Sequence, residues 1–171
     1  MRYIDTLLRA VTVLFRVLLG LCFLVLIVAV LVQVLGRFGG SSPVWTEELT
    51  RFALLYLAAV GAGLALRTGD LVNVDVVIEL LPERAAWACR LLSAVLIAAL
   101  GLGLLPGAWR FVSIGSFQTA PALGIPMTYA HFSVFLMLAL LAFFALLRIV
   151  GMFAGTTDGR PESMPVDTGA N

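Results

Sequence analysis

The chain has 171 residues, of which 61% are hydrophobic and 12% are charged. Soluble domains carry about 25% charged residues, and the mean hydropathy of +1.07 departs in the same direction. A core of this size cannot hide so large an apolar excess, so lipid must be the solvent for much of the surface. With 11 basic and 10 acidic residues the formal net charge is +1, which excludes the strongly basic face of a nucleic-acid-binding protein.

The first sixteen residues predict an amphipathic helix. Their polar side chains recur every three or four positions and form one stripe: Arg2, Asp5, Arg9, Thr12 and Arg16. Such a helix would lie on the anionic cytoplasmic leaflet before the chain turns into the membrane. It is either a topology signal that holds the N-terminus inside or a partner-binding segment, and we favour the topology signal.

Four segments are long and apolar enough to cross a hydrocarbon core, which takes about 20 apolar residues. They cover residues 17–36, 44–66, 91–109 and 129–147. The second segment is uncharged only from Phe52 to Leu66, so it must begin near Val44 with its charged residues in the outer interface. The sequence therefore predicts an all-α integral membrane protein with one four-helix domain, residues 1–154, and a disordered cytoplasmic tail, residues 155–171.

The distribution of arginines predicts the orientation, because cytoplasmic loops carry the excess of basic residues. With the N-terminus inside, eight arginines lie on the cytoplasmic side: Arg2, Arg9, Arg16, Arg67, Arg84, Arg90, Arg148 and Arg160. The outer side holds three: Arg37, Arg51 and Arg110. We therefore expect both termini in the cytoplasm and the chain in a bacterial inner membrane.

The first polar cluster lies between the first two spans and contains Arg37, Trp45, Glu47, Glu48 and Arg51. Glu47 and Glu48 precede Arg51 by four and three positions, so on a helix both carboxylates can reach its guanidinium. Arg37 is a second candidate partner, and Trp45 suits the membrane interface. The paired carboxylates could relay protons or bind a cation, or they could form an ion-paired cap on the second helix. We favour the structural interpretation.

The second polar cluster follows the second span. Gly69 and Asp70 break the helix, and the next residues place Asn73 and Asp75 in a turn on the cytoplasmic side. Arg67 lies within reach of Asp70 if the chain turns tightly. The cluster is either a docking surface or a solvated loop, and the sequence alone leaves both open.

The segment Phe111–Pro126 carries no charge, yet its Gly and Pro residues argue against a continuous helix. Exposed irregular backbone is not tolerated in the hydrocarbon region unless protein covers it. This outer segment is therefore either covered by a protein partner or is an apolar interfacial loop.

None of the four spans has an ionisable residue near its middle, where intramembrane charges usually mark ion or substrate pathways. The single histidine, His131, falls near an outer end and is interpreted as a polar anchor. Cys22 and Cys89 form no C-x-x-C pair, which argues against a zinc or redox site. A single histidine cannot provide bis-histidine haem ligation or a metal set, so we expect no metal, cofactor or catalytic site. Small residues four apart predict close helix packing: Ala58 with Ala62, Gly61 with Ala65, Ala94 with Ala98, and Ala99 with Gly103.

The sequence resembles the small permease subunits of tripartite ATP-independent periplasmic (TRAP) transporters, the DctQ-like proteins. The resemblance covers roughly residues 10 to 150. It is carried by Arg37, Trp45-x-Glu47-Glu48-Leu49-x-Arg51-Phe52, Gly61, Arg67-x-Gly69, Val74-Asp75, Leu81-Pro82 and the run from Pro121 to Pro126. One departure is Leu71, where the family often has a histidine.

The resemblance implies a four-helix subunit that is not an enzyme and that associates with a much larger permease subunit holding the substrate and Na⁺ sites. A periplasmic solute-binding protein would deliver an organic acid, often a carboxylate, to the pair. The small subunit would extend the static scaffold, and the seven residues Arg37, Trp45, Glu47, Glu48, Arg51, Arg67 and Asp75 would be subunit-interface or structural residues. The alternatives are the small subunit of a tripartite tricarboxylate transporter and a self-sufficient small membrane carrier.

Overall fold

The computed structural model describes the backbone of residues 2–40, 43–68 and 82–154, and the side chains of these ranges from residue 11 onward. The described elements, in chain order, are α1 (Arg2–Phe38), α2 (Trp45–Thr68), α4 (Glu83–Ile114), the short 3₁₀ helix η1 (Gly115–Phe117) and α5 (Thr128–Phe153). The predicted all-α class is confirmed. Asp75 and the predicted tail, residues 155–171, lie outside the described residues.

Four of the described helices are long and apolar enough to cross a membrane. Each predicted span coincides with one of them, apart from Val44, which precedes α2, and most of the helices continue past the predicted ends. One such difference is at α4, which begins at Glu83 rather than near residue 91. The predicted span leaves out residues 83–90 because they include charged side chains. A helix can nevertheless continue beyond the hydrocarbon core. Pro82 before the helix and Glu83 in its first turn both favour a helix start there.

Helix α1 is continuous from Arg2 to Phe38. At 1.5 Å per residue its 37 residues measure about 55 Å, well beyond a hydrocarbon core of about 30 Å. The expectation that the chain turns between an interfacial helix and the first span is therefore wrong. The amphipathic residues simply extend the spanning helix.

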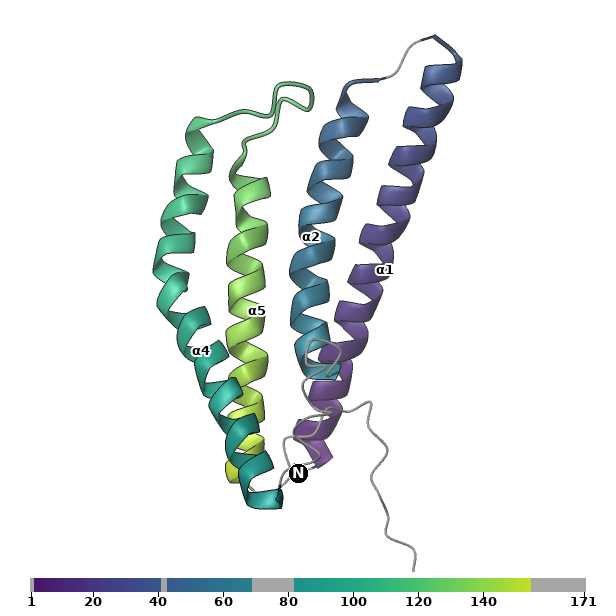
Figure 1. Ribbon diagram of the computed structural model, residues 1–171. Coiled ribbons are helices and arrows are strands. Elements are labelled where there is room, and N and C mark those ends of the chain that lie inside the picture. Colours follow the sequence, from purple (N-terminus) through teal and green to yellow (C-terminus); the bar gives the residue numbers. More distant parts are fainter. Residues whose placement is uncertain (1, 41–42, 69–81, 155–171) are drawn as a thin grey trace, which may run out of the picture.

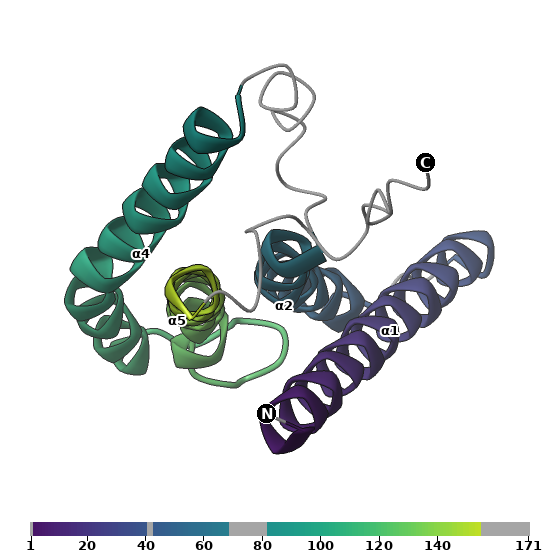
Figure 2. The same cartoon turned by 90° about the horizontal axis from the view of Figure 1, so that it is seen from below.

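The helices form an open row in the order α1, α2, α5, α4 (Figures 1 and 2). α1 packs on α2, α2 on α5, and α5 on α4, whereas α4 does not pack against α1 or α2 in the part of the chain described. The ring of Phe15 reaches past α2 to the ring of Phe144, with centroids 6.2 Å apart. The molecule is thus a layer one helix thick, not a closed four-helix bundle.

Small residues let α5 pack closely on both of its neighbours. A Cβ atom on Gly63 of α2 would lie 2.8 Å from the Cβ of Leu140, and one on Gly101 of α4 would lie 3.0 Å from the Cβ of Ala142. The predicted pair Ala94 and Ala98 is buried. Ala99 and Gly103, by contrast, are exposed, and the space beside Gly103 is open.

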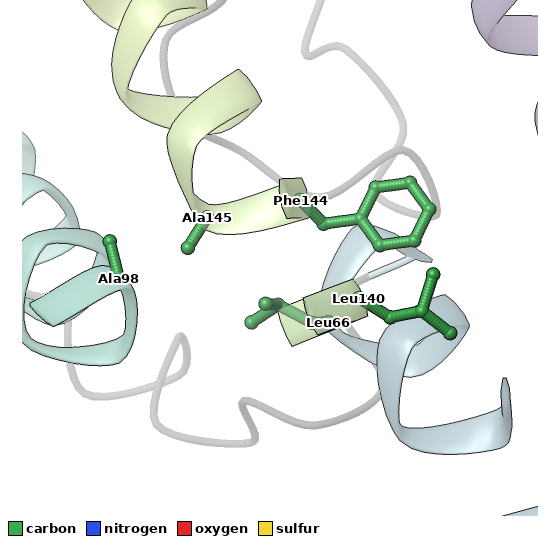
Figure 3. Close-up of a cluster of buried hydrophobic side chains, with 5 residues drawn as sticks. All are labelled: Leu66, Ala98, Leu140, Phe144 and Ala145. Atoms are coloured by element: carbon green, nitrogen blue, oxygen red, sulfur yellow. The ribbon is translucent and has the colours of Figure 1, made fainter. Parts of the chain in front are cut away.

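A buried cluster joins α2, α5 and α4, three consecutive helices of the row (Figure 3). Ala145 of α5 faces Ala98 of α4, while Phe144 points to the other side of α5 (Figure 3). The remaining members are Leu66 of α2 and Leu140 of α5. The cluster therefore places α5 at the centre of the packing.

The segment between α4 and α5 is a compact hairpin, residues 118–127. Its backbone bonds run from Met127 to the Gln118 carbonyl and from Ala120 to the Ile125 carbonyl, both at 2.8 Å. Gly124 has a φ of +67°, a left-handed conformation that glycine adopts without strain. Ala120 is 1% exposed and packs with Phe52 of α2. The predicted irregular segment is thus helical as far as Phe117, and the hairpin after it is partly covered by this chain's own α2.

Candidate functional site

Five of the seven predicted site residues lie at the upper end of the molecule in Figure 1, where α1 ends and α2 begins. Arg37 is in the last turn of α1, Trp45 is the first residue of α2, and Glu47 and Glu48 are in the first turn of α2. Arg51 follows one turn later. The 118–127 hairpin lies at the same end (Figure 1). We call this group, α1 and α2 termini plus hairpin, the upper site.

Arg67 is at the opposite end of α2, in its last turn. Its guanidinium carbon lies 5.9 Å from the centre of the Phe144 ring, within cation–π range. Arg67 therefore joins the lower ends of α2 and α5 and is not part of the upper site. Its predicted neighbour Asp70 falls outside the described residues.

Thr46 fixes the start of α2. Its hydroxyl donates to the Pro43 carbonyl at 2.6 Å, and its amide donates to the same oxygen at 3.2 Å. The Thr46 side chain is fully buried, and the Thr50 hydroxyl donates to the Thr46 carbonyl at 2.8 Å. This local network holds the first turn of α2, and the next two side chains, Glu47 and Glu48, go to different partners.

Glu47 links α2 to α1. Its Oε1 accepts a hydrogen bond of 3.3 Å from the side-chain amide of Gln33, the only strongly polar residue within the first predicted span. Both groups are exposed, so the bond adds little to stability. It does show that Gln33 faces α2.

Glu48 holds the hairpin. Its Oε2 accepts two backbone hydrogen bonds, from the amides of Ala122 at 3.1 Å and Leu123 at 2.8 Å. Both amides are in the turn of the hairpin, and the contact is half-buried. A carboxylate that accepts from two backbone amides forms charge-assisted bonds, which are about twice as strong as neutral ones. Glu48 therefore connects α2 to a segment more than seventy positions later in the sequence.

The expected ion pairs do not form. Among the described residues, no ion pair within 4.0 Å joins Glu47 or Glu48 to Arg51 or Arg37. The helical spacing would allow these pairs, but Glu48 is already bonded to the hairpin and Glu47 to Gln33. The side chains of Arg37, Trp45 and Arg51 are exposed on the surface of the upper site.

A further hydrogen bond connects α2 directly to α5. The hydroxyl of Tyr56 donates to the backbone carbonyl of Tyr129 at 2.8 Å. Neither the composition nor the spacing of the sequence singled out Tyr56. Its position eight residues after Glu48 places the two on one side of α2.

The end of α4 meets the start of α5 at Gly115. A Cβ atom there would lie 2.6 Å from the Thr128 nitrogen and 2.8 Å from Nδ1 of His131, so only glycine fits. The His131 ring stacks on Phe111 with centroids 3.9 Å apart, and its Nδ1 lies 3.0 Å from the Phe111 carbonyl. Because a carbonyl only accepts, Nδ1 donates this bond. His131 thus anchors α5 to α4 rather than to lipid headgroups alone.

These contacts connect helices and do not assemble reactive groups. No cluster of three or more His, Cys, Asp or Glu side chains able to hold a metal occurs in the ranges the structure describes. The carboxylates of the upper site bond to an amide side chain and to backbone amides.

Comparison with known proteins identifies a family for this chain. Residues 26–155 match the family model described as tripartite ATP-independent periplasmic transporters, DctQ component. A relative named "Putative TRAP transporter small permease protein", from Haemophilus influenzae, is 25% identical over 107 residues. That alignment covers 62% of this chain and 66% of the relative, just under two thirds of its length.

The family match covers well over half of the chain and includes α2, α4, α5 and the upper site. It decides against the tripartite tricarboxylate alternative. Permease components are a transport class and not a class of enzymes. The chain therefore belongs to the family of DctQ components of tripartite ATP-independent periplasmic transporters.

Proposed function

We propose that this chain is a scaffold: the small membrane subunit against which the large permease subunit of a TRAP transporter assembles. The complex takes up an organic acid, a carboxylate, and a Na⁺ gradient drives this uptake. A periplasmic binding protein delivers the acid. The substrate and Na⁺ sites belong to the large subunit.

One observation carries this proposal. The four long described helices contain no Asp, Glu, Lys or Arg along the stretches that would cross the membrane, which are residues 17–36, 52–66, 91–109 and 129–147. A carrier needs polar groups along a path through the membrane. The described charged side chains instead all lie outside these four stretches, which suits a scaffold.

The proposed topology places the upper site in the periplasm and both termini in the cytoplasm of a bacterium, with the helices in the inner membrane. The arginine distribution supports this orientation. Exposed Arg37, Trp45 and Arg51 are then candidates for contact with the large subunit on the periplasmic side. Arg67 and Asp75 are structural or interface candidates on the cytoplasmic side.

The test is co-purification from native membranes with a tag on the C-terminus. We expect a large polytopic permease in about equal amount, and loss of uptake in a strain that lacks this chain but retains the permease in its membrane. Purification of the chain alone, together with normal uptake in the deletion strain, would contradict the scaffold role and favour a self-sufficient carrier.

A further inference from the structure

The row of helices consists of two halves. One half is α1 with α2, and the other is α4 with α5 and the hairpin. They meet mainly along α2 and α5 (Figure 2), and the ring of Phe15 of α1 also contacts Phe144 of α5. In the membrane, apolar contacts between the halves compete with equally apolar lipid tails, so they resist separation less strongly than the same contacts would in water.

Three hydrogen bonds cross between the halves at the upper end. Two run from the Ala122 and Leu123 amides to Glu48, and one runs from the Tyr56 hydroxyl to the Tyr129 carbonyl. Glu48 and Tyr56 both belong to α2, whereas all of their partners belong to the other half. We call these two side chains with their three backbone partners the upper latch.

The partners of the upper latch are held within their own half. The hairpin is closed by its two backbone bonds of 2.8 Å, and the close approach at Gly115 leaves no room for α5 to slide along α4. A hydrogen bond to a rigid partner constrains direction as well as distance. The latch therefore constrains the angle between the two halves at the upper end, in addition to the close apolar packing of Gly63 and Leu66 against α5 lower in the row.

We propose that Glu48 and Tyr56 are positioning residues that lock the two halves into one rigid row. The inference rests on the proposed function in one respect: the rigid row is the shape against which the large subunit works. If these hydrogen bonds are broken, the relative angle of the two halves varies. The subunit is then still in the membrane, but it no longer presents one fixed surface to the large subunit.

The direct test measures the distance between the halves. Spin labels go on cysteines at Phe38 and Phe117, which are 87% and 90% exposed and lie outside the latch, with Cys22→Ala and Cys89→Ala as background. We expect one narrow distance distribution in the native chain and a broad one in Glu48→Ala and Tyr56→Phe. The matched controls are Glu47→Ala and Tyr129→Phe, which each remove a similar group that the latch does not use, and both should stay narrow.

Hydrogen exchange gives a second readout at the latch itself. Loss of a charged acceptor should raise the exchange rates of the Ala122 and Leu123 amides by about ten- to a hundredfold in Glu48→Ala. Glu48→Gln keeps an oxygen that can accept the same bonds, so it should restore most of the protection. If exchange and label distances in Glu48→Ala equal those in Glu47→Ala, the latch is overturned.

Uptake measurements, together with co-purification, distinguish a failure of the latch from a failure of the proposed scaffold function. Per assembled complex, Glu48→Ala should lower the maximal uptake rate severalfold and leave the half-saturating substrate concentration unchanged, while Tyr129→Phe behaves as the native chain. Failure of the native chain to co-purify with a permease would overturn the scaffold role but not the latch. Tyr56→Phe removes a single hydroxyl, so it tests the latch even if Glu48→Ala does not accumulate.

Discussion

At the scale of single residues, the upper site shows how two neighbouring carboxylates acquire different tasks. Glu47 is exposed and meets one side-chain amide, whereas Glu48 is half-buried and accepts from two backbone amides of the hairpin. The difference follows from Thr46, whose buried hydroxyl fixes the first turn of α2. Side chains left exposed there, such as Arg51, remain available to another subunit.

Arg51→Ala should weaken assembly more than it affects substrate binding. Arg51 is exposed and has no ion-pair partner among the described acidic residues, so its removal leaves this chain's fold intact. A charged side chain fully desolvated in an interface can be worth several kcal/mol, but a rim charge is worth about 1 kcal/mol or less. We expect Arg51 to be desolvated in the interface with the large subunit, so Arg51→Ala should lower the amount of co-purified permease by about fivefold or more.

Arg110→Ala is the matched control, because Arg110 is also exposed and lies toward the upper end of α4. The half-saturating substrate concentration should not change in either variant. A normal yield of complex with altered substrate affinity would contradict the interface role of Arg51.

Gly115→Ala should destabilise the joint between α4 and α5. The new Cβ would meet the Thr128 backbone at 2.6 Å, and backbone cannot move aside as the end of a flexible side chain can. Overpacking of this kind costs about 1–3 kcal/mol, which thermal unfolding of the chain in detergent can measure. Gly103→Ala in α4 is the control, since the space beside Gly103 is open. Equal unfolding temperatures for the two variants would contradict this account.

At the scale of the elements, the sequence predicts where the helices lie along the chain better than which helices pack against each other. Long apolar runs place the four spans, because lipid requires about 20 such residues in each. The ends are less certain, since α1 and α4 continue through charged turns outside the hydrocarbon. The order of packing is not predictable, because a helix that is apolar all round has no face that identifies its partner.

The same distinction applies to the upper site. Chain order alone brings Arg37, Trp45, Glu47, Glu48 and Arg51 to one end of adjacent helices. The partner of Glu48 could not be predicted, because its donors are backbone amides in a remote hairpin and leave no side-chain pattern. Tyr56 was missed for the same reason, since its acceptor is a backbone carbonyl.

The crossing of α2 and α5 provides a prediction for an element pair. Gly63→Ala should lower the unfolding temperature, because its Cβ would lie 2.8 Å from the Leu140 Cβ and would force the helices apart. Gly61→Ala, two positions away, is the control: its nearest contact is Leu19 Cδ1 at 3.6 Å, an ordinary van der Waals distance. We expect a difference of about 1–3 kcal/mol between the two variants in thermal unfolding. A Gly63→Ala chain as stable as Gly61→Ala would mean that the helices are not in close contact.

At the scale of the whole molecule, the open row determines which surfaces are available. Each inner helix has two neighbours, and the two edge helices, α1 and α4, have one each. In the most apolar 18-residue stretch of α1, only 6% is buried within the chain, compared with 39% in the corresponding stretch of α2. Both broad faces of the row must therefore be covered by lipid or by another membrane subunit.

The orientation of this row can be tested with a membrane-impermeant thiol reagent. In the Cys22→Ala, Cys89→Ala background, single cysteines replace Phe117 at the upper end and Glu83 at the lower end, both exposed. Spheroplasts should label Phe117→Cys at once and Glu83→Cys only after the membrane is disrupted, because the arginine excess holds the lower end inside. The reverse pattern would place the upper site in the cytoplasm. The hairpin and the exposed side chains beside it would then face away from any periplasmic binding protein.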